Sequence, residues 1–318
     1  MTNSINTQLS NGYIIPFVLD GGMVRGRLVR LGSAFSDITK KHQYPPIVNH
    51  YIGEMLSLGA ALIMDMKAEG IITLQVTKGS VIRMIVADIT SDGNVRACAT
   101  WDDEALNTLL QKTPKPSLAQ LFAGGNLMFT VSLKHQKEDY QAIVELNGAT
   151  LADCMHHYFR QSEQVPTGLF ICTDFSTLPV QSEIETFQAG ALIIQRTPID
   201  PESDSETLAE IDDSWFTDIS LLATITPHEL LSCDISAEML LYRLFHERDL
   251  HLSVPKAIQA KCRCSEERIR DMLVNFSKDD LDAILIDENV TVTCDFCSTN
   301  YVFSEDEIRQ AASKRKSI

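Results

Sequence analysis

Hydrophobic and polar residues alternate along much of the first half of the chain, which is the pattern of β-strands. These stretches are rich in β-branched and aromatic residues, and Gly21-Gly22 and Asp92-Gly93 stand where tight turns would separate them. We predict strands in the following stretches: residues 13–31 (two strands, or a strand with a turn), 71–76, 80–89, 94–100, 127–133, 139–146, 168–175 and 190–196.

Two stretches of the same region carry apolar residues at helical spacing instead. Residues 45–66 form the most apolar long segment, although His50 and Glu54 interrupt it. We interpret it as a buried helix that is too polar and too short to span a bilayer. Residues 151–164 predict a second helix. Strands and helices in this order predict an α+β fold, with a core domain of mixed helices and sheet over residues 1–198.

The composition changes after this domain. Residues 199–250 contain 13 acidic side chains and only two basic ones, Arg243 and Arg248, so the segment has a charge of −11. It also has apolar residues at helical spacing, which a disordered tail would not need. We predict a metastable helical linker over residues 199–256, folded only while it rests on another part of the protein. An ordinary pair of solvated helices is the alternative. The apolar residues are Trp215, Phe216, Ile219, Leu222, Met239, Leu240, Leu241, Leu244 and Phe245.

The last segment, residues 257–318, holds four cysteines in two close pairs. Cys262 and Cys264 form a Cys-x-Cys pair, and Cys294 and Cys297 form a Cys-x-x-Cys pair. The second pair lies between two alternating stretches, VTVT and NYVF, so we expect it at the tip of a β-hairpin.

Serine residues mark where the helices of this segment begin. Ser265 precedes EERIRDMLVNF, Ser277 precedes a short helix that runs to Ile286, and Ser304 precedes a last helix that ends in the basic tail KRK. The last two serines have an acidic residue three positions later, as in a capping box.

Four thiolates are a ligand set that structural zinc prefers, with Zn–S distances of ~2.3 Å in a tetrahedron. We therefore predict a small zinc domain in which Phe296, Tyr301 and Phe303 build a core around the metal. Such a closed site has no open position for water and is not hydrolytic. Two disulfides are the alternative, and the two states can interconvert, because an oxidised thiolate forms a disulfide with an adjacent thiol.

Metal loss is expected to unfold this small domain. Structural zinc contributes ~10–16 kcal/mol of apparent binding free energy in small domains, whereas a whole domain is stable by only ~5–15 kcal/mol. We expect residues around 257–305 to unfold without the metal. A linker that leans on the small domain would then open with it and expose its apolar face.

The four other cysteines give weaker signals. Cys98 and Cys172 lie in strand patterns and are expected to be buried. Cys154 lies beside two histidines on a predicted helix, with no partner motif, and we interpret it as structural. Cys233 lies in the linker, where it is open to adventitious oxidation.

The net charge of −16 argues against a protein that binds nucleic acid or an anionic membrane. The N-terminus lacks a basic start followed by an apolar run, so we expect no secretory signal and a cytoplasmic location. The sequence has no Gly-rich phosphate loop, no Gly-x-Ser-x-Gly and no His-Glu-x-x-His, so we expect a protein that is not an enzyme.

Several motifs, taken together, resemble the heat shock protein 33 family of redox-regulated chaperones. The most specific are KCRCSEER and CDFCSTNYVFS, with RLFHERDL just before them. VRGRLVRL, GIITLQV, VIRMIVADITSDGNVRACA, YFRQSEQVPTGLF and GALIIQ extend the resemblance in order over nearly the whole chain. Two departures are Ser298, where the family often has glycine, and the turn TKGS near residue 78. Serine at such a turn is expected to strain the knuckle slightly.

The resemblance implies a redox switch. In the reduced form, one zinc ion would be held by Cys262, Cys264, Cys294 and Cys297, and the protein would be an inactive monomer. Oxidation would form the disulfides Cys262–Cys264 and Cys294–Cys297 and release the zinc. The linker would then unfold, and a homodimer would hold unfolding client proteins without ATP.

Two other functions compete with this one. A zinc-ribbon protein that binds nucleic acid would use the KRK tail, but the net charge opposes it. A thiol-disulfide oxidoreductase would use Cys294 and Cys297, but such cysteines usually lie at a helix N-terminus in a βαβ unit.

Overall fold

A computed structural model of the protein describes residues 12–66, 68–174, 188–198, 205–286 and 289–315. The chain divides into two compact units, Met1–Ala260 and Lys261–Ile318. The finer division into a core domain, a linker and a small domain stays a prediction. The first residues of the predicted linker, 199–204, lie outside the described residues, as do Phe175 of one predicted strand and Lys316 of the basic tail.

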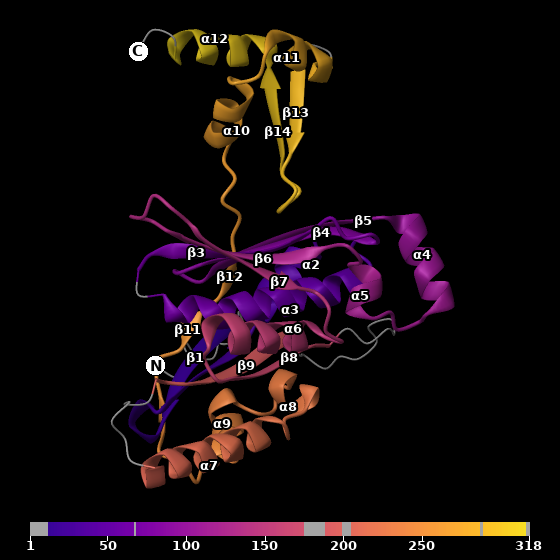
Figure 1. Cartoon of the computed structure of the whole chain (residues 1–318). Helices are drawn as coiled ribbons and strands as arrows, with labels where there is room; N and C mark the ends of the chain where they lie inside the picture. Colours follow the sequence, from indigo (N-terminus) through magenta and orange to yellow (C-terminus); the bar gives the residue numbers. More distant parts are fainter. Residues whose placement is uncertain (1–11, 67, 175–187, 199–204, 287–288, 316–318) are drawn as a thin grey trace. The chain divides into compact units, whose positions relative to one another are not determined.

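In the described part of the first unit, two six-stranded sheets enclose the core (Figure 1). The first sheet has the order β10-β1-β2-β9-β8, and β11 also pairs with β1. Its strands are antiparallel: β1 (Tyr13–Leu19), β2 (Val24–Arg30), β8 (Thr167–Thr173), β9 (Ala189–Arg196), β10 (Leu250–Leu252) and β11 (Lys256–Ala257).

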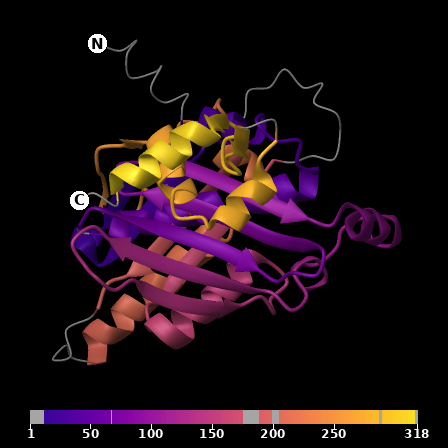
Figure 2. The same cartoon turned by 90° about the horizontal axis from the view of Figure 1, so that it is seen from above.

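The second sheet has the order β12-β5-β4-β3-β6-β7, and its long strands lie side by side in Figure 2. It is antiparallel except for the pair β12 and β5. Its strands are β3 (Gly70–Thr77), β4 (Ile82–Thr90), β5 (Asn94–Trp101), β6 (Asn126–Leu133), β7 (Tyr140–Glu145) and β12 (Gln259–Ala260). The predicted α+β fold is therefore confirmed, and the long predicted strands are present.

Helix α3 (Pro46–Leu62) lies between the two sheets and contacts strands of both (Figure 1). Two glycines let the sheets approach it. A Cβ atom on Gly59 would lie 2.3 Å from Cδ1 of Ile89 in the second sheet, and one on Gly53 would lie 2.7 Å from Cγ2 of Thr173 in the first. The predicted buried helix is thus confirmed, and it forms the centre of the core.

By length and composition alone, Pro46–Asp65 could cross a membrane, so the expectation that it is too short and too polar was wrong. However, 78% of its most apolar window is buried inside the fold, as in the core helix of a globular domain.

Three helices of the predicted linker cover the outer face of the first sheet: α7 (Ser205–Leu222), α8 (Pro227–Leu231) and α9 (Ala237–Phe245) (Figure 1). The alternation of β1 explains how the sheet serves two layers. Ile14 points to the layer of α3, whereas Tyr13, Ile15 and Phe17 point to the layer of the linker helices. The linker helices therefore rest on the first sheet, which is the other part of the protein that the predicted linker required.

Arg30 of β2 joins this sheet to the linker through hydrogen bonds. Its side chain is 1% exposed, and its guanidinium donates to the carbonyl oxygens of Glu229 (3.1 Å), Leu230 (2.7 Å) and Ile235 (2.8 Å). It also donates to the hydroxyl of Tyr13 (3.2 Å). One buried cation thus holds the end of α8 and the loop before α9.

A second polar junction involves Arg248, which follows α9. Its guanidinium pairs with Asp20, at the turn between β1 and β2 (2.5 Å), and with Asp218 of α7 (3.0 Å). It also donates to the carbonyl oxygen of Ser214 (3.0 Å). Arg248 belongs to the RLFHERDL motif, so this motif joins the segment after α9 to α7 and to the turn between β1 and β2.

The second unit contains α10 (Glu266–Leu273), α11 (Lys278–Ile284), the hairpin β13 (Asn289–Thr293) and β14 (Asn300–Ser304), and α12 (Glu305–Arg315). Ser265, Ser277 and Ser304 accept the capping hydrogen bonds predicted for them. Its buried apolar cluster is small: Leu273, Leu281, Val290, Phe303 and Ile308.

Three short helices were not predicted: α2 (Ser33–Thr39), α4 (Asp103–Lys112) and α5 (Leu118–Leu121). For two of these helices, the sequence does contain a residue that can cap the helix N-terminus. Asp102 accepts from the N–H of Ala105 at the start of α4, and Ser117 forms a capping box with Gln120 at the start of α5. The predicted helix at 151–164 continues from α6 (Leu151–Tyr158) into a π-helical turn (Phe159–Glu163).

Replacing Arg30 is expected to loosen the linker. Arg30→Met removes the donor from three carbonyl oxygens, one in a buried hydrogen bond (Leu230) and two in partly buried ones. A buried acceptor without a donor costs ~1–3 kcal/mol. We expect α8 and α9 to lose about 3 kcal/mol or more of protection in hydrogen exchange. Arg83→Met serves as control, because the exposed pair of Arg83 with Asp102 is worth at most about 1 kcal/mol. Equal protection in the two variants would contradict the anchoring role.

Asp218 predicts a pH dependence of linker docking. Burial raises its pKa to about 6, against the lowering effect of Arg248, and Asp20 adds to the rise. Between the pKa of an unfolded aspartate, ~4, and about 6, the docked state binds more protons than the released state. Docking therefore weakens as pH rises through this window, and the loss is complete above it.

The test compares hydrogen exchange of α7 in the natural protein and in Asp218→Asn at several pH values. The variant lacks the titrating group, so its protection relative to the natural protein should increase from pH 4 to pH 7. A constant difference would show that Asp218 does not titrate in this range.

Candidate metal centre

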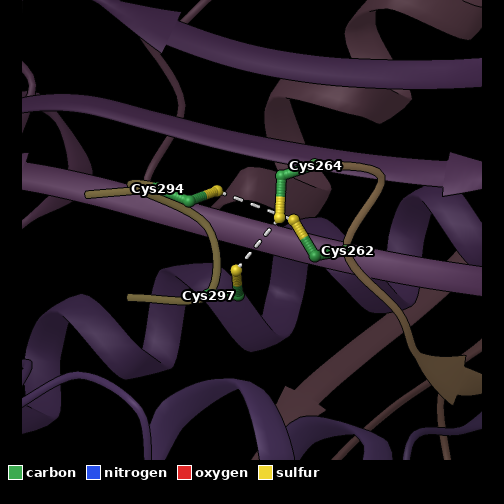
Figure 3. A group of neighbouring side chains, drawn as sticks. All are labelled: Cys262, Cys264, Cys294 and Cys297. Carbon is green, nitrogen blue, oxygen red and sulfur yellow. Dashed lines mark hydrogen bonds between the residues drawn. The ribbon is translucent and has the colours of Figure 1, made fainter. Parts of the chain in front are cut away.

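The two cysteine pairs converge on one point of the second unit (Figure 3). The four Sγ atoms all lie within 4.8 Å of one another. Cys262 and Cys294 are 3.7 Å apart, and Cys264 and Cys297 are 3.4 Å apart. A tetrahedron with metal–sulfur distances of ~2.3 Å places its sulfurs about 3.8 Å apart. The cluster therefore has the size of a four-thiolate metal site.

The β-hairpin positions the second pair, as predicted. Cys294 follows the end of β13, and its N–H donates to the carbonyl oxygen of Thr299 (3.0 Å). Its own carbonyl oxygen accepts from the N–H groups of Cys297 (3.3 Å) and Ser298 (2.8 Å). This closed turn brings both sulfurs to one side. Ser298 has a φ angle of 55°, which is the left-handed backbone conformation. A residue with a Cβ atom is strained in this conformation, as predicted for Ser298.

The first pair is fixed on its C-terminal side by a helix cap. Cys264 directly precedes Ser265, whose hydroxyl accepts from the N–H of Arg268 (3.2 Å) at the start of α10. The guanidinium of Arg268 in turn donates to the carbonyl oxygen of Arg263 (2.8 Å), between the two cysteines. These contacts order the short Cys-x-Cys turn.

The sulfurs differ in how readily they ionise. Burial raises the pKa of Cys264, and it raises the pKa of Cys294 to about 12. Burial also acts to raise the pKa of Cys297, but hydrogen bonds from the hydroxyl and N–H of Thr299 and from the neighbouring cysteines lower it to about 6. The cluster thus has four sulfur ligands, and one of them, Cys297, ionises easily. Such a cluster favours a divalent cation, whose positive charge would ionise the remaining three thiols.

A tyrosine side chain supports the cluster. The hydroxyl of Tyr301 lies 3.1 Å from Sγ of Cys264, and this hydrogen bond raises the pKa of Tyr301 to about 12. Phe303 is buried in the apolar cluster of the unit, as predicted. Phe296, between Cys294 and Cys297, is half-buried and lies outside that apolar cluster; its place in a core around the metal stays a prediction.

The remaining cysteines lie outside this cluster. All eight cysteines lie in the described part of the chain, and none of them forms a disulfide there. Cys98, Cys154 and Cys172 are buried in the first unit, and Cys154 accepts a hydrogen bond from the N–H of Gly148 (3.3 Å). Cys233 is exposed between α8 and α9. The predicted burial of Cys98 and Cys172 is confirmed, and Cys154 is buried as well.

The surroundings of Cys294 and Cys297 are unlike those of a dithiol oxidoreductase. The pair lies between two antiparallel strands, β13 and β14, and the helix α12 starts only after the second strand. No helix N-terminus follows Cys297 directly, so the pair lacks the βαβ setting that such a function requires.

The fold and the site together define a class of two-unit proteins. In this class, a two-sheet α+β domain is followed by a small unit that carries a four-cysteine centre. The sequence model described as "Hsp33 protein" matches residues 12–304. The chain belongs to the Hsp33 family.

Relatives and a solved structure agree with this assignment. The chain is 32% identical over 301 residues to the 33 kDa chaperonin of Photorhabdus laumondii, covering 94% of this chain and 96% of that protein. It is 33% identical over 294 residues to the 33 kDa chaperonin of Neisseria gonorrhoeae, covering 92% and 88%. The crystal structure of the 33 kDa chaperonin of Thermotoga maritima has a TM-score of 0.76 at 21% identity, covering 97% and 100%. The class is therefore that of the chaperones.

Ser298 provides a test of the hairpin geometry. A side chain with a Cβ costs ~1–2 kcal/mol in the left-handed conformation, and glycine avoids this cost. We expect Ser298→Gly to stabilise the second unit by about 1 kcal/mol in hydrogen exchange. Ser298→Ala keeps the Cβ and should bring no gain. Equal stability of the glycine and alanine variants would contradict the strained turn.

Proposed function

We propose that the protein is a redox-regulated holdase, a chaperone that binds unfolded proteins without ATP. The observation that carries the proposal is the pairing of two features in one chain. One is a cluster of four thiols in a small unit. The other is an apolar sheet face that, within the described residues, the acidic linker helices cover. Membership of a chaperone family supports the same reading.

In the reduced form, Cys262, Cys264, Cys294 and Cys297 would hold one zinc ion. When bound, the ion would cross-link the two halves of the second unit and add binding free energy to its fold. The unit needs this contribution, because its buried apolar cluster has only five members in the part of the chain that the structure describes. Small domains with such cores commonly depend on a metal.

Oxidation would change the ligands themselves. A thiolate attacks peroxide and becomes a sulfenic acid, and the peroxide is reduced to water. The neighbouring thiol then attacks the sulfenic sulfur, which forms a disulfide and releases a second water. We propose the pairs Cys262–Cys264 and Cys294–Cys297. Each disulfide removes two thiolates from the cluster, so the metal would leave and the second unit would unfold.

The same change would release the linker. Residues 250–260 connect α9 to the cysteine segment through β10, β11 and β12, which are only two or three residues long. Their contacts with β1 and β5 are therefore few, and unfolding that begins at Cys262 can spread through them. Undocking of the linker would expose the outer face of the first sheet, including Phe17 and Leu28.

This exposed face would bind apolar segments of unfolded client proteins and, in a homodimer, a second copy of the chain. We propose a cytoplasmic location, where thiols are kept reduced until oxidative stress. Nucleic acid and membranes are not among the proposed partners, because the net charge of −16 repels both. No catalytic reaction on a substrate is part of this function.

The test measures bound zinc and the light scattering of a thermally aggregating client, before and after peroxide treatment at elevated temperature. We expect one zinc ion per chain to leave as the protein begins to suppress aggregation. Cys297→Ser leaves three thiols, and we expect it to bind zinc more weakly and to lose the dependence on oxidant.

Cys233→Ser is the matched control, because Cys233 is an exposed cysteine outside the cluster. It should keep both zinc and the switch. Zinc that stays bound in the active protein, or zinc loss without any protection of the client, would contradict the proposed function.

A further inference from the structure

A cavity of about 450 Å³ opens in the first unit, beside the end of α3. Its walls come from β2, β3, β6 and β9 and from the π-helical turn that follows α6. Small-molecule sites have volumes of ~300–1,000 Å³. This cavity is therefore large enough for a small organic ligand, and the proposed redox switch makes no use of it.

Most of the lining is apolar. Aliphatic and aromatic surface comes from the second sheet, from α3 and α6, and from the π-helical turn. The residues are Leu62, Ile72, Phe129, Met155 and Phe159. Such walls favour a ligand with an apolar body, because its burial removes hydrocarbon surface from water.

The β2 side of the cavity carries two guanidinium groups. Arg25 and Arg27 lie two positions apart on one strand, so both point to the same side of the first sheet. Arg27 is 5% exposed, pairs with Asp65 and donates to Oε1 of Gln195 (2.6 Å). Among the described residues, no carboxylate lies within ion-pair distance of Arg25, which is exposed. This part of the lining thus has two cations for one carboxylate.

The other charged and hydroxyl groups of the lining already have partners. Arg196 pairs with Asp212, which lies outside the cavity. The hydroxyls of Tyr140 and Tyr158 both donate to Oε1 of Glu163, at 2.9 Å and 2.5 Å. Glu163 ends the π-helical turn, and Gln164 after it has φ of 54°. π-Helical turns and left-handed residues are often found at functional sites. The tyrosines satisfy the negative charge of Glu163. Arg25 is near Asp65 and lowers its pKa, but among the described residues Asp65 forms its ion pair with Arg27 and none is recorded for Arg25.

We propose that this cavity binds a small amphipathic organic acid, with its apolar body against Phe129 and Ile72 and its acidic group between Arg25 and Arg27. The ligand is a free acid and not a lipid of a bilayer. The net charge of −16 opposes approach to an anionic membrane. Fatty acids of medium chain length have the required chemistry.

The experiment uses the full-length reduced protein and isothermal titration calorimetry with decanoate below its micelle concentration. Decanol and decyltrimethylammonium are neutral and cationic probes with the same tail. We expect saturable binding of one decanoate per chain, and binding of the other two at least roughly tenfold weaker.

Arg25→Gln should weaken decanoate binding by roughly tenfold or more, because it removes the guanidinium without a partner. Val131→Trp, which fills the cavity from β6, should abolish binding. Arg160→Gln is the matched control: Arg160 is an exposed arginine of the π-helical turn that does not line the cavity, and its loss should have no effect.

Three results would overturn the proposal: equal affinity in Arg25→Gln, equal binding of the cationic probe, or binding without saturation. Vesicles of phosphatidylglycerol form a separate arm, and binding to vesicles but not to free decanoate would also overturn it. Because the test uses the reduced protein and no client, its outcome is independent of the chaperone assay.

Discussion

The fold depends on the burial of the first sheet on both faces. Strands β1, β2 and β9 carry apolar residues at successive positions, so one face packs on the layer of α3 and the other needs a second cover. The linker helices provide that cover. The hydrophobic effect drives this contact, and the hydrogen bonds of Arg30 set its register by meeting carbonyl oxygens at fixed points of the linker.

The composition of the linker supports the proposal that the same contact is reversible. Its net charge of −11 over residues 199–250 adds repulsion among neighbouring helices, while only a few of its acids have partners in the described structure. Arg196 pairs with Asp212, and Arg248 pairs with Asp218. On α7 and α9, Phe216 and Tyr242 stay 67% and 60% exposed, so the docked helices still present apolar side chains to solvent. We therefore propose that packing holds this cover in place and that modest changes in its surroundings release it.

Much of this architecture could be predicted from the sequence, because period-two alternation and capping residues act locally. The strands, the central helix, the hairpin around Cys294 and the caps at Ser265 and Ser277 follow from a few neighbouring residues each. The proximity of the four thiols follows from their spacing and the hairpin. The short helices α2, α4 and α5 were missed, because short amphipathic segments give weak periodicity.

Tertiary contacts could not be predicted in this way. Nothing local to Arg30 indicates that its partners are carbonyl oxygens 200 residues away. The sequence pattern of the linker predicted an apolar face, but it did not indicate which surface of the protein this face covers. Only the structure shows that it covers the first sheet. The cavity beside α3 is likewise built from five separate stretches of the chain.

The central claim is that oxidation of the cysteine cluster undocks α7, α8 and α9 from the first sheet. Hydrogen exchange of the amides in these helices, compared between the reduced and the peroxide-treated protein, tests it most directly. The account predicts protection in the reduced protein and its loss in the oxidised one, while α3 stays protected in both. Linker helices that remain protected in an oxidised protein that already holds clients would contradict it.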